Sequence, residues 1–206
     1  MAITTYSELQ DAMLAWVNKQ DIAQSLPTFI SLAEADMQRK LRHWRMEKRS
    51  TATLDTQYST LPTDFLEPIR LLLTGNKPTR LEMIGVGELA ERRQNVVDTS
   101  GAPRFFAIVD GKIEVHPQPD GDYTLEMVYY SKIPALTTSN TSNWVLENHV
   151  DAYLYGSLLH TAPFLGDDPR LQTWSALYES AINAINAESE STKTGGAGRR
   201  IQIRSY

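Results

Sequence analysis

The chain has 206 residues, of which 41% are hydrophobic and 22% are charged. These proportions are ordinary for a globular protein and exclude wholesale disorder, because they supply enough apolar material for a core. The net charge of −5 argues against a protein that binds nucleic acid freely, so we expect any contact with DNA to be local or repulsive. The lack of cysteine excludes disulfides, thiolate metal sites and a cysteine nucleophile.

Neither a membrane span nor a secretion signal is predicted. No apolar run approaches the roughly 18 residues that a membrane span needs. Residues 1–10 are polar, carry Glu8 and lack the basic segment followed by an apolar segment that marks a signal peptide. We therefore expect a protein that is made in a cytoplasm and has no membrane partner.

Two helices are predicted at the start of the chain. Apolar residues recur at helical spacing from Thr5 to Lys19, with Thr5 or Ser7 as the N-cap. Ser25 before Pro27 is a start signal for a second helix. Its apolar stripe is about five turns long and consists of Ile30, Ala33, Met37, Leu41 and Trp44. The two helices are predicted to form an antiparallel hairpin.

The pattern changes to β near Ser50. Residues 50–59 alternate loosely as a strand does, and residues 61–65 break the alternation as a turn. Residues 67–73 and 80–84 are further candidate strands, the first of them buried. Residues 87–94 have the pattern of a short polar helix.

The clearest β signal lies between residues 105 and 130. The strand Phe105–Val109 is followed by Asp110-Gly111, a typical two-residue hairpin turn, after which Ile113 and Val115 resume the alternation. After a second turn at Asp120-Gly121, one face of the next strand carries Tyr123, Leu125, Met127 and Tyr129. Three strands and two such turns predict an antiparallel β-meander.

Helices return in the last third of the chain. One is predicted from Trp144 to His160, and another begins where Asp168 provides a cap and Pro169 the first helical position. The apolar face of the latter consists of Leu171, Trp174, Leu177, Tyr178, Ala181, Ile182 and Ile185. From Glu188 to Tyr206 the chain is polar and glycine-rich, which is typical of a tail.

The order of elements predicts an α+β protein that is mainly α. Its helical bundle is built from N- and C-terminal helices, an antiparallel β-meander is inserted between them, and the C-terminal tail is extended. In residue numbers, 1–49 and 140–190 form the helical bundle, 50–139 the inserted β-rich region, and 191–206 an extended C-terminal arm.

Several segments, taken in order, resemble a known family. The resemblance rests on SLAEADMQRKLR at 31–42, LPTDFL at 61–66, DGKI at 110–113, DAYLYGSLL at 151–159 and a basic C-terminal tail. Together they cover nearly the whole chain and are similar to phage adaptor, or head-to-tail connector, proteins of the podovirus type.

The resemblance implies a structural protein of the virion rather than an enzyme. Such adaptors form a dodecameric ring beneath the portal protein, at the interface of head and tail. Their helical bundles surround a channel through which double-stranded DNA passes without specific recognition during genome ejection. The β part reaches toward tail or nozzle proteins, and the C-terminal arm lies along the portal. A stopper or tail-completion protein is the nearest structural alternative.

The C-terminal arm is a candidate site for portal binding. After a glycine-rich hinge, the residues alternate between polar and apolar: Arg199, Arg200, Ile201, Gln202, Ile203 and Arg204. A short strand on a hinge suits addition to the edge of another protein's sheet, and arginines can bind carboxylates bidentately. The alternative is a frayed terminus without a function.

A basic cluster closes the second predicted helix. Its members are Arg39, Lys40, Arg42, Arg45, Lys48 and Arg49. They are candidates for contact with portal carboxylates or with passing DNA. The alternative is that they are cations placed favourably at a helix C-terminus.

No residue pattern predicts catalysis, a metal or a cofactor. His149 and His160 lie about 16 Å apart along one predicted helix, whereas metal ligands on a helix lie one turn apart. Glu34 and Asp36 are the carboxylates that a peptidoglycan-degrading hydrolase, the enzymatic alternative, would use. Two residues apart on a helix, they point in nearly opposite directions, and Asp167 and Asp168 are explained by capping.

Overall fold

A computed structural model describes residues 3–75, 78–94, 99–166 and 168–193. The chain divides into two compact units, which we call the helical unit (Met1–Arg45 with Ile133–Tyr206) and the β unit (Met46–Lys132). Within the described ranges, helices account for 48% and strands for 25% of the chain, which confirms the predicted α+β, mainly α class. No helix in these ranges combines the length and apolar character that crossing a bilayer requires.

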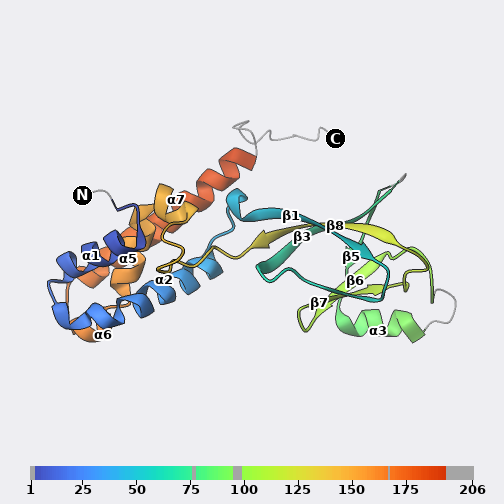
Figure 1. Cartoon of the computed structure of the whole chain (residues 1–206), viewed down its shortest axis with the longest axis horizontal. Helices are drawn as coiled ribbons and strands as arrows, with labels where there is room; N and C mark the ends of the chain where they lie inside the picture. The colour runs from blue at the N-terminus through green and yellow to red at the C-terminus, as the bar shows by residue number, and fades with distance from the viewer. Residues whose placement is uncertain (1–2, 76–77, 95–98, 167, 194–206) are drawn as a thin grey trace, which may run out of the picture. The chain divides into compact units, whose positions relative to one another are not determined.

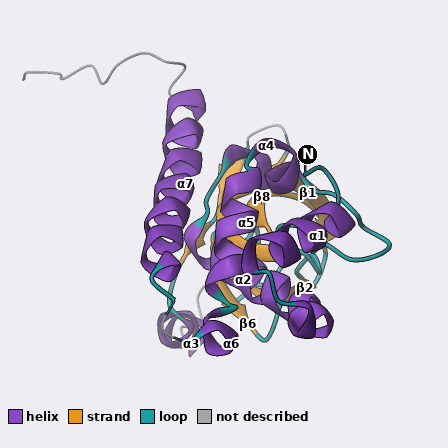
Figure 2. Ribbon diagram, turned by 90° about the vertical axis from the view of Figure 1, so that its left-hand side faces the viewer, coloured by secondary structure: helices purple, strands orange, loops and turns teal. Residues whose placement is uncertain are grey.

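The helical unit contains four longer helices and several short ones among its described residues (Figures 1 and 2). The longer helices are α1 (Tyr6–Val17), α2 (Leu26–Lys40), α5 (Val150–Leu159) and α7 (Arg170–Lys193). The short ones are η1 (Gln20–Ser25), α4 (Trp144–Asn148) and α6 (Ala162–Leu165), and η2 (Trp44–Met46) begins at its boundary.

Helix α5 is the centre of the helical unit. It contacts α1, α2, α4 and α7, and Figure 2 shows it between α1 and α7. Its buried residues lie on all sides of the helix: Ala152, Tyr153, Leu154, Gly156, Ser157 and Leu158. A helix that is apolar all round is stable only in the middle of other helices, so the N- and C-terminal helices pack as one body around it.

Helix α1 begins as the sequence predicts. The Thr5 side chain accepts a hydrogen bond from the Glu8 backbone N–H, and the Glu8 carboxylate accepts one from the Thr5 N–H, which completes a capping box. The helix ends at Asn18, whose φ of 55° is left-handed. Trp16 in this helix is 44% exposed, and its ring packs edge-on against Tyr155 with the centroids 5.9 Å apart.

Helix α2 ends at Lys40, so the prediction that it continues to Trp44 is wrong. Leu41 is extended, with ψ at 135°, and Trp44 lies in η2. Side chains of α7 satisfy the backbone after this break: Asn186 accepts from the Arg42 N–H at 3.2 Å and Ser189 accepts from the Trp44 N–H at 3.0 Å. The helix can therefore stop without leaving buried N–H groups unpaired.

The single helix predicted over residues 144–160 is two helices. His149 ends α4 and precedes α5 with φ −138° and ψ 57°, outside the helical region. At this break its ring packs edge-on against Trp144 and His43. In α7, the predicted cap is confirmed, because the Asp168 carboxylate accepts from the Arg170 N–H at 2.9 Å. Leu177 is exposed rather than part of the buried face.

The β unit is a sandwich of two sheets with one helix, α3 (Val86–Gln94). The first sheet has the order β1 (Glu47–Leu54), β8 (Tyr123–Ser131), β3 (Phe65–Thr74) and β4 (Thr79–Arg80). The second has the order β2 (Tyr58–Thr60), β7 (Lys112–His116), β6 (Phe105–Val109) and β5 (Glu82–Met83). The predicted strand 50–59 is thus two strands, which belong to different sheets.

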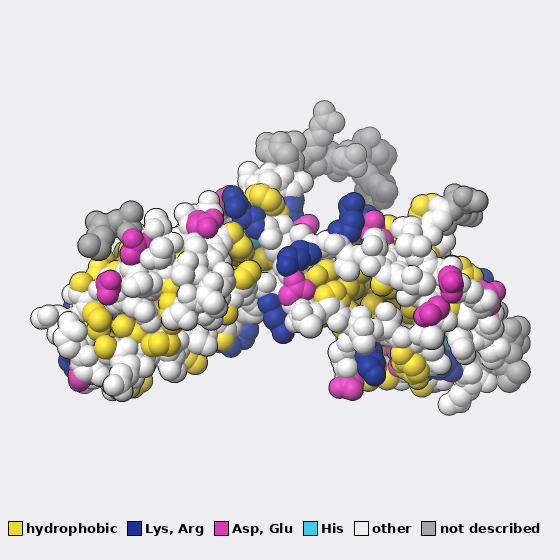
Figure 3. Space-filling view, viewed as in Figure 1, with side chains coloured by type: hydrophobic (Ala, Val, Ile, Leu, Met, Phe, Trp, Pro, Cys, Tyr) yellow, Lys and Arg dark blue, Asp and Glu magenta, His cyan; other side chains and the backbone are white. Residues whose placement is uncertain are grey.

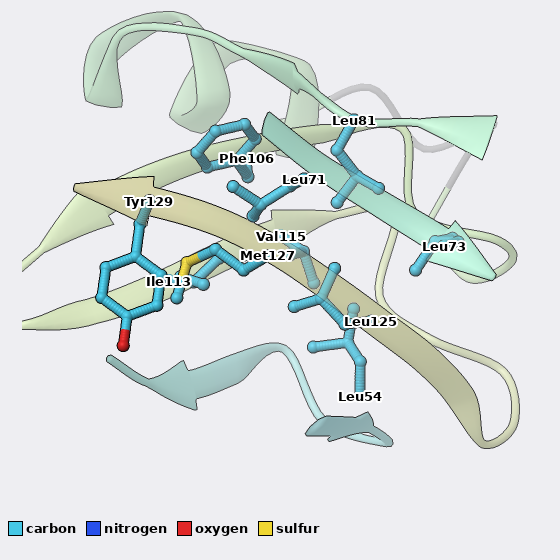
Figure 4. Close-up of a cluster of buried hydrophobic side chains, with 10 residues drawn as sticks. All are labelled: Leu54, Leu71, Leu73, Leu81, Phe106, Ile113, Val115, Leu125, Met127 and Tyr129. Carbon is cyan, nitrogen blue, oxygen red and sulfur yellow. The ribbon is translucent and has the colours of Figure 1, made fainter. Parts of the chain in front are cut away.

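Both sheets contribute side chains to one core (Figure 4). Leu71, Leu125 and Met127 come from the first sheet, and Phe106, Ile113 and Val115 from the second. The strand predicted at 67–73 is confirmed, but only Leu71 and Leu73 in it are buried, because its first half lies at the open side of the sandwich.

The predicted meander needs one correction. Asp110 and Gly111 have φ of 50° and 68°, so they form the expected hairpin turn between β6 and β7. The third strand, β8, does not pair with β7 but lies between β1 and β3 in the other sheet. The connection over residues 117–122 is longer than a two-residue turn, so the chain can cross from one sheet to the other.

Candidate partner-binding surfaces

The C-terminal arm lies outside the described residues. This holds for all of the candidate portal-binding residues: Arg199, Arg200, Ile201, Gln202, Ile203 and Arg204. Helix α7 continues to Lys193, so it includes the first residues of the segment predicted to be extended.

The basic cluster is divided between the two units. Arg39, Lys40, Arg42 and Arg45 belong to the helical unit, whereas Lys48 and Arg49 belong to β1 of the β unit. The boundary between the units follows Arg45.

Asp36 organises the end of α2. Its carboxylate contacts Lys40 Nζ at 2.9 Å and Arg39 Nη2 at 3.2 Å, and it accepts a hydrogen bond from the Tyr178 hydroxyl at 2.8 Å. Burial alone would raise the pKa of Asp36, but the hydrogen bonds from Lys40 and Tyr178 outweigh it, so the pKa is lowered. Lys40 also contacts Glu179 at 2.6 Å and thereby joins α2 to α7.

Arg42 and Arg45 have local contacts. The Arg42 guanidinium donates to the backbone carbonyls of Gln38 and Leu41, at 3.1 and 2.7 Å, which are orphan acceptors at the end of α2. Arg45 lies over the Trp44 ring, 5.0 Å from its centroid. Arg39, by contrast, keeps 69% of its side chain exposed and is therefore open to a partner.

Lys48 and Arg49 pair with carboxylates of the β unit. Lys48 contacts Asp64 at 2.6 Å, and Asp64 also accepts from the Tyr129 hydroxyl at 2.9 Å. The hydrogen bond from Lys48 lowers the pKa of Asp64, while burial and the bond to Asp64 raise the pKa of Tyr129 to about 12. Arg49 lies 3.6 Å from Glu126 and is 67% exposed.

Glu34 has a structural use. Its Oε1 accepts from the Leu136 N–H at 2.7 Å and from the Tyr153 hydroxyl at 3.1 Å. Tyr153 accepts in turn from Asn143, which caps α4. Burial raises the pKa of Glu34, although its hydrogen bonds oppose the shift. The carboxylate considered for a hydrolase thus connects α2, α4 and α5.

His43 and His149 lie side by side, which their spacing in the sequence does not predict. His43 is fully buried, stacks on Trp144 at 4.7 Å, and accepts from the Arg45 N–H at Nδ1. Its Nε2 lies 3.9 Å from Glu188, whose other oxygen lies 3.6 Å from His149. Within the described part of the chain, no group of histidine and carboxylate side chains has a geometry suited to a metal ion.

The β unit carries two exposed apolar patches, which sequence reasoning missed. The tip patch consists of Tyr58, Val109, Asp110 and Lys112 around the β6–β7 turn. The groove patch consists of Ile69, Arg80, Glu82 and Met83 beside a groove of about 560 Å³. Tyr58 and Met83 are 53% and 55% exposed, and Figure 3 shows hydrophobic side chains on the surface of the unit. Neither patch can be predicted from the order of residues, because each combines residues from separate strands.

Comparison with protein families places the chain beside phage adaptors. The sequence pattern of the family described as SU10 adaptor protein matches residues 4–201 of this chain. The match spans both units and reaches Ile201 in the candidate arm. No curated protein matches the chain.

Proposed function

The chain belongs to the SU10 adaptor protein family, a family of phage structural adaptors, and from this membership we propose that it joins the portal of the head to the tail. The single observation that carries the proposal is the match over residues 4–201, which includes helices, sandwich and part of the arm. We further propose that copies assemble as a ring, with twelve subunits as in the adaptors that the sequence resembles. Double-stranded DNA passes through this ring, and the protein is a component of the virion.

The portal is bound through the C-terminal arm. Ile201 and Ile203 are two residues apart, so on a strand added to a sheet of the portal both would face the partner's apolar surface. The flanking Arg199, Arg200 and Arg204 bind carboxylates. The arm loses conformational freedom on docking, so we propose that the ring forms on the portal and not before it.

The basic residues have a secondary role in this proposal. Arg39 and Arg49, whose side chains are 69% and 67% exposed, contact portal carboxylates or the DNA that passes. The net charge of −5 suits a channel that transmits DNA without retaining it.

No catalytic activity is part of the proposed function. Glu34 and Asp36 both have partners that use their carboxylates in packing, which favours a structural role over acid–base chemistry. Zymography of the purified protein on peptidoglycan is expected to show no clearing, and clearing would establish the hydrolase alternative instead.

Electron microscopy of the protein mixed with its portal tests the adaptor role. We expect a ring of added density under the portal with the full chain and none with a chain that lacks residues 195–206. Ile201→Asp should abolish the ring, whereas Gln202→Ala, on the opposite face, should leave it intact. Added density on a tail component alone would indicate a stopper or tail-completion protein. No association of the full chain with portal would contradict the proposal.

A further inference from the structure

The two exposed patches of the β unit lie at opposite edges of one sheet. In the order β2, β7, β6, β5, Tyr58 belongs to the first edge strand and Met83 to the last. Opposite edges of a sheet cannot both face the same neighbour, but they can each face a different one. A contact that joins one edge to the other edge of the next copy is heterologous, and repeated contacts of this type form a ring when the rotation between copies closes.

The tip patch surrounds the β6–β7 turn, beside an open hollow of about 370 Å³. Tyr58 pairs with Glu114, and Val109 pairs with Lys112, so these side chains share the outer face of the second sheet. Helix α3 covers only the neighbouring part of that face, where Arg92 lies over Phe105 at 4.0 Å. Tyr58 and Val109 therefore stay 53% and 40% exposed, beside the hairpin turn that carries Asp110.

The groove patch is a hollow with an apolar floor. The groove of about 560 Å³ lies between β3 and β5. Among the described residues, β4 pairs only with Leu72 and Leu73 of β3, so the earlier part of β3 has no strand beside it on that edge. Buried Leu71 and Phe106 form the floor, and Ile69 and Met83, 37% and 55% exposed, stand at the rim.

The charges of the two patches are complementary. The groove patch carries Arg80 and Glu82, and the tip patch carries Asp110 and Lys112. Among the residues that the structure describes, none of these four charges has an ion-pair partner within its own chain. The hairpin turn thus offers one acid and one base, and the groove offers one base and one acid.

We propose that the tip patch of one copy inserts into the groove patch of the next copy, and that this contact joins neighbouring β units in the assembled ring. The occupant of the groove is a second copy of this chain, with Asp110 facing Arg80 and Lys112 facing Glu82. This inference rests on the proposed function, because it specifies a contact within the proposed ring. A stable protein interface buries about 1,200–2,000 Å². Two patches of four side chains fall well short of that area, so this contact is too small to hold free copies together. It adds to the binding of copies that the portal has already brought side by side.

Engineered cysteines test the contact directly, because the natural chain has none. Tyr58→Cys and Met83→Cys are introduced together, the protein is assembled on its portal, and disulfide formation is followed on a non-reducing gel. We expect a ladder of cross-linked multimers from the double variant and none from either single variant. Thr53→Cys with Met83→Cys is the matched control, since Thr53 is exposed on β1 away from both patches.

The outcomes separate this inference from the adaptor role. Dimers from a single variant would indicate a self-complementary contact and overturn the proposal, as would a ladder of equal strength from the control. A ring visible by electron microscopy without any ladder would overturn the inference while the adaptor role stands. No ring at all would contradict both proposals.

Charge reversal supplies a second measurement that needs no disulfide. Arg80→Glu and Asp110→Lys should each reduce ring occupancy on the portal at least severalfold, and the two changes together should restore it. Additive loss in the double variant would contradict the pairing. Circular dichroism of the free variants shows whether each one folds.

Discussion

The ring of Tyr178 on α7 lies directly against the backbone of Gly156 on α5. A Cβ atom placed at Gly156 would lie 2.9 Å from Cε2 of that ring and 3.5 Å from Ala33 on α2. Tyr178 cannot simply turn away, because its hydroxyl donates to Asp36 on α2. Three helices therefore meet at a point where only glycine fits.

Gly156→Ala should destabilise the helical unit by about 1–3 kcal/mol, because the added methyl group overpacks a closed contact. Denaturant unfolding followed by far-ultraviolet circular dichroism measures the loss. Gly87→Ala in α3 is the control, since nothing lies within 4 Å of its Cβ position and alanine gains up to about 1 kcal/mol of helix propensity. Equal effects of the two substitutions would show that the contact with Tyr178 is not closely packed.

Glu34→Ala should destabilise the helical unit by about 1–3 kcal/mol for each donor that loses its acceptor, namely Leu136 N–H and Tyr153 hydroxyl. Glu34→Gln keeps an acceptor oxygen at the same place, so its loss at neutral pH should be much smaller. If both variants were equally unstable, the charge rather than the hydrogen bonds would be the important property of Glu34.

Glu34 also predicts a pH dependence. Burial raises its pKa in the folded chain above the ordinary value of 4.5, so the folded state binds the proton more tightly than the unfolded state does. Its contribution to stability is complete below 4.5 and is lost as the pH rises through the folded pKa. The wild type alone loses this contribution, so the stability difference between Glu34→Gln and wild type should shift in favour of the variant as the pH rises from 4 to 7. Thermal midpoints measured across that range test this prediction. A difference that does not change with pH would contradict the pKa shift.

Burial lowers the pKa of His43 below the ordinary value of 6.5, so the neutral imidazole should persist to lower pH than in the unfolded chain. Glu188 opposes this shift, whereas His149, Arg45 and Lys193 add to it. Glu188→Gln is therefore expected to lower the pKa of His43 further. Nuclear magnetic resonance titration of the imidazole signals measures both values, and His43→Gln identifies the signal among the four histidines.

His43 and Glu34 change the folding stability in opposite directions as the pH falls. The unfolded state binds the proton more readily, so the stability that neutral His43 provides is complete above pH 6.5 and is lost as the pH falls through the folded pKa. Trp144 stacks on this ring, so its fluorescence reports protonation directly. A pKa for His43 at or above 6.5 would show that the imidazole is not isolated from solvent.

Arg39→Gln and Arg49→Gln should leave the unfolding transition unchanged, because exposed ion pairs contribute little to stability. Both should weaken portal binding at low salt, and the difference from wild type should shrink at high salt. Arg104→Gln, an exposed arginine outside the basic cluster, is the control. If both variants bind the portal as the wild type does, Arg39 and Arg49 make only local contacts within their own helix and strand.

The sequence by itself determined the order of elements and most of their local chemistry. The Thr5–Glu8 capping box, the Asp110-Gly111 turn and the Asp168 cap are set by neighbours in the chain, so reading residues in order predicts them. The α+β class and the likeness to phage adaptors also follow from order alone, since both depend on which elements occur and in what succession.

Only the tertiary structure decided which distant residues meet. Helix α2 stops at Lys40 because Asn186 and Ser189 of α7 accept the next free N–H groups. Strand β8 leaves the expected meander because β1 and β3 offer it two partners in the other sheet. Residues that are distant in the sequence form the His43–Glu188 contact and the two patches of the β unit. Such contacts depend on how faces are buried in three dimensions, and linear spacing carries no record of that.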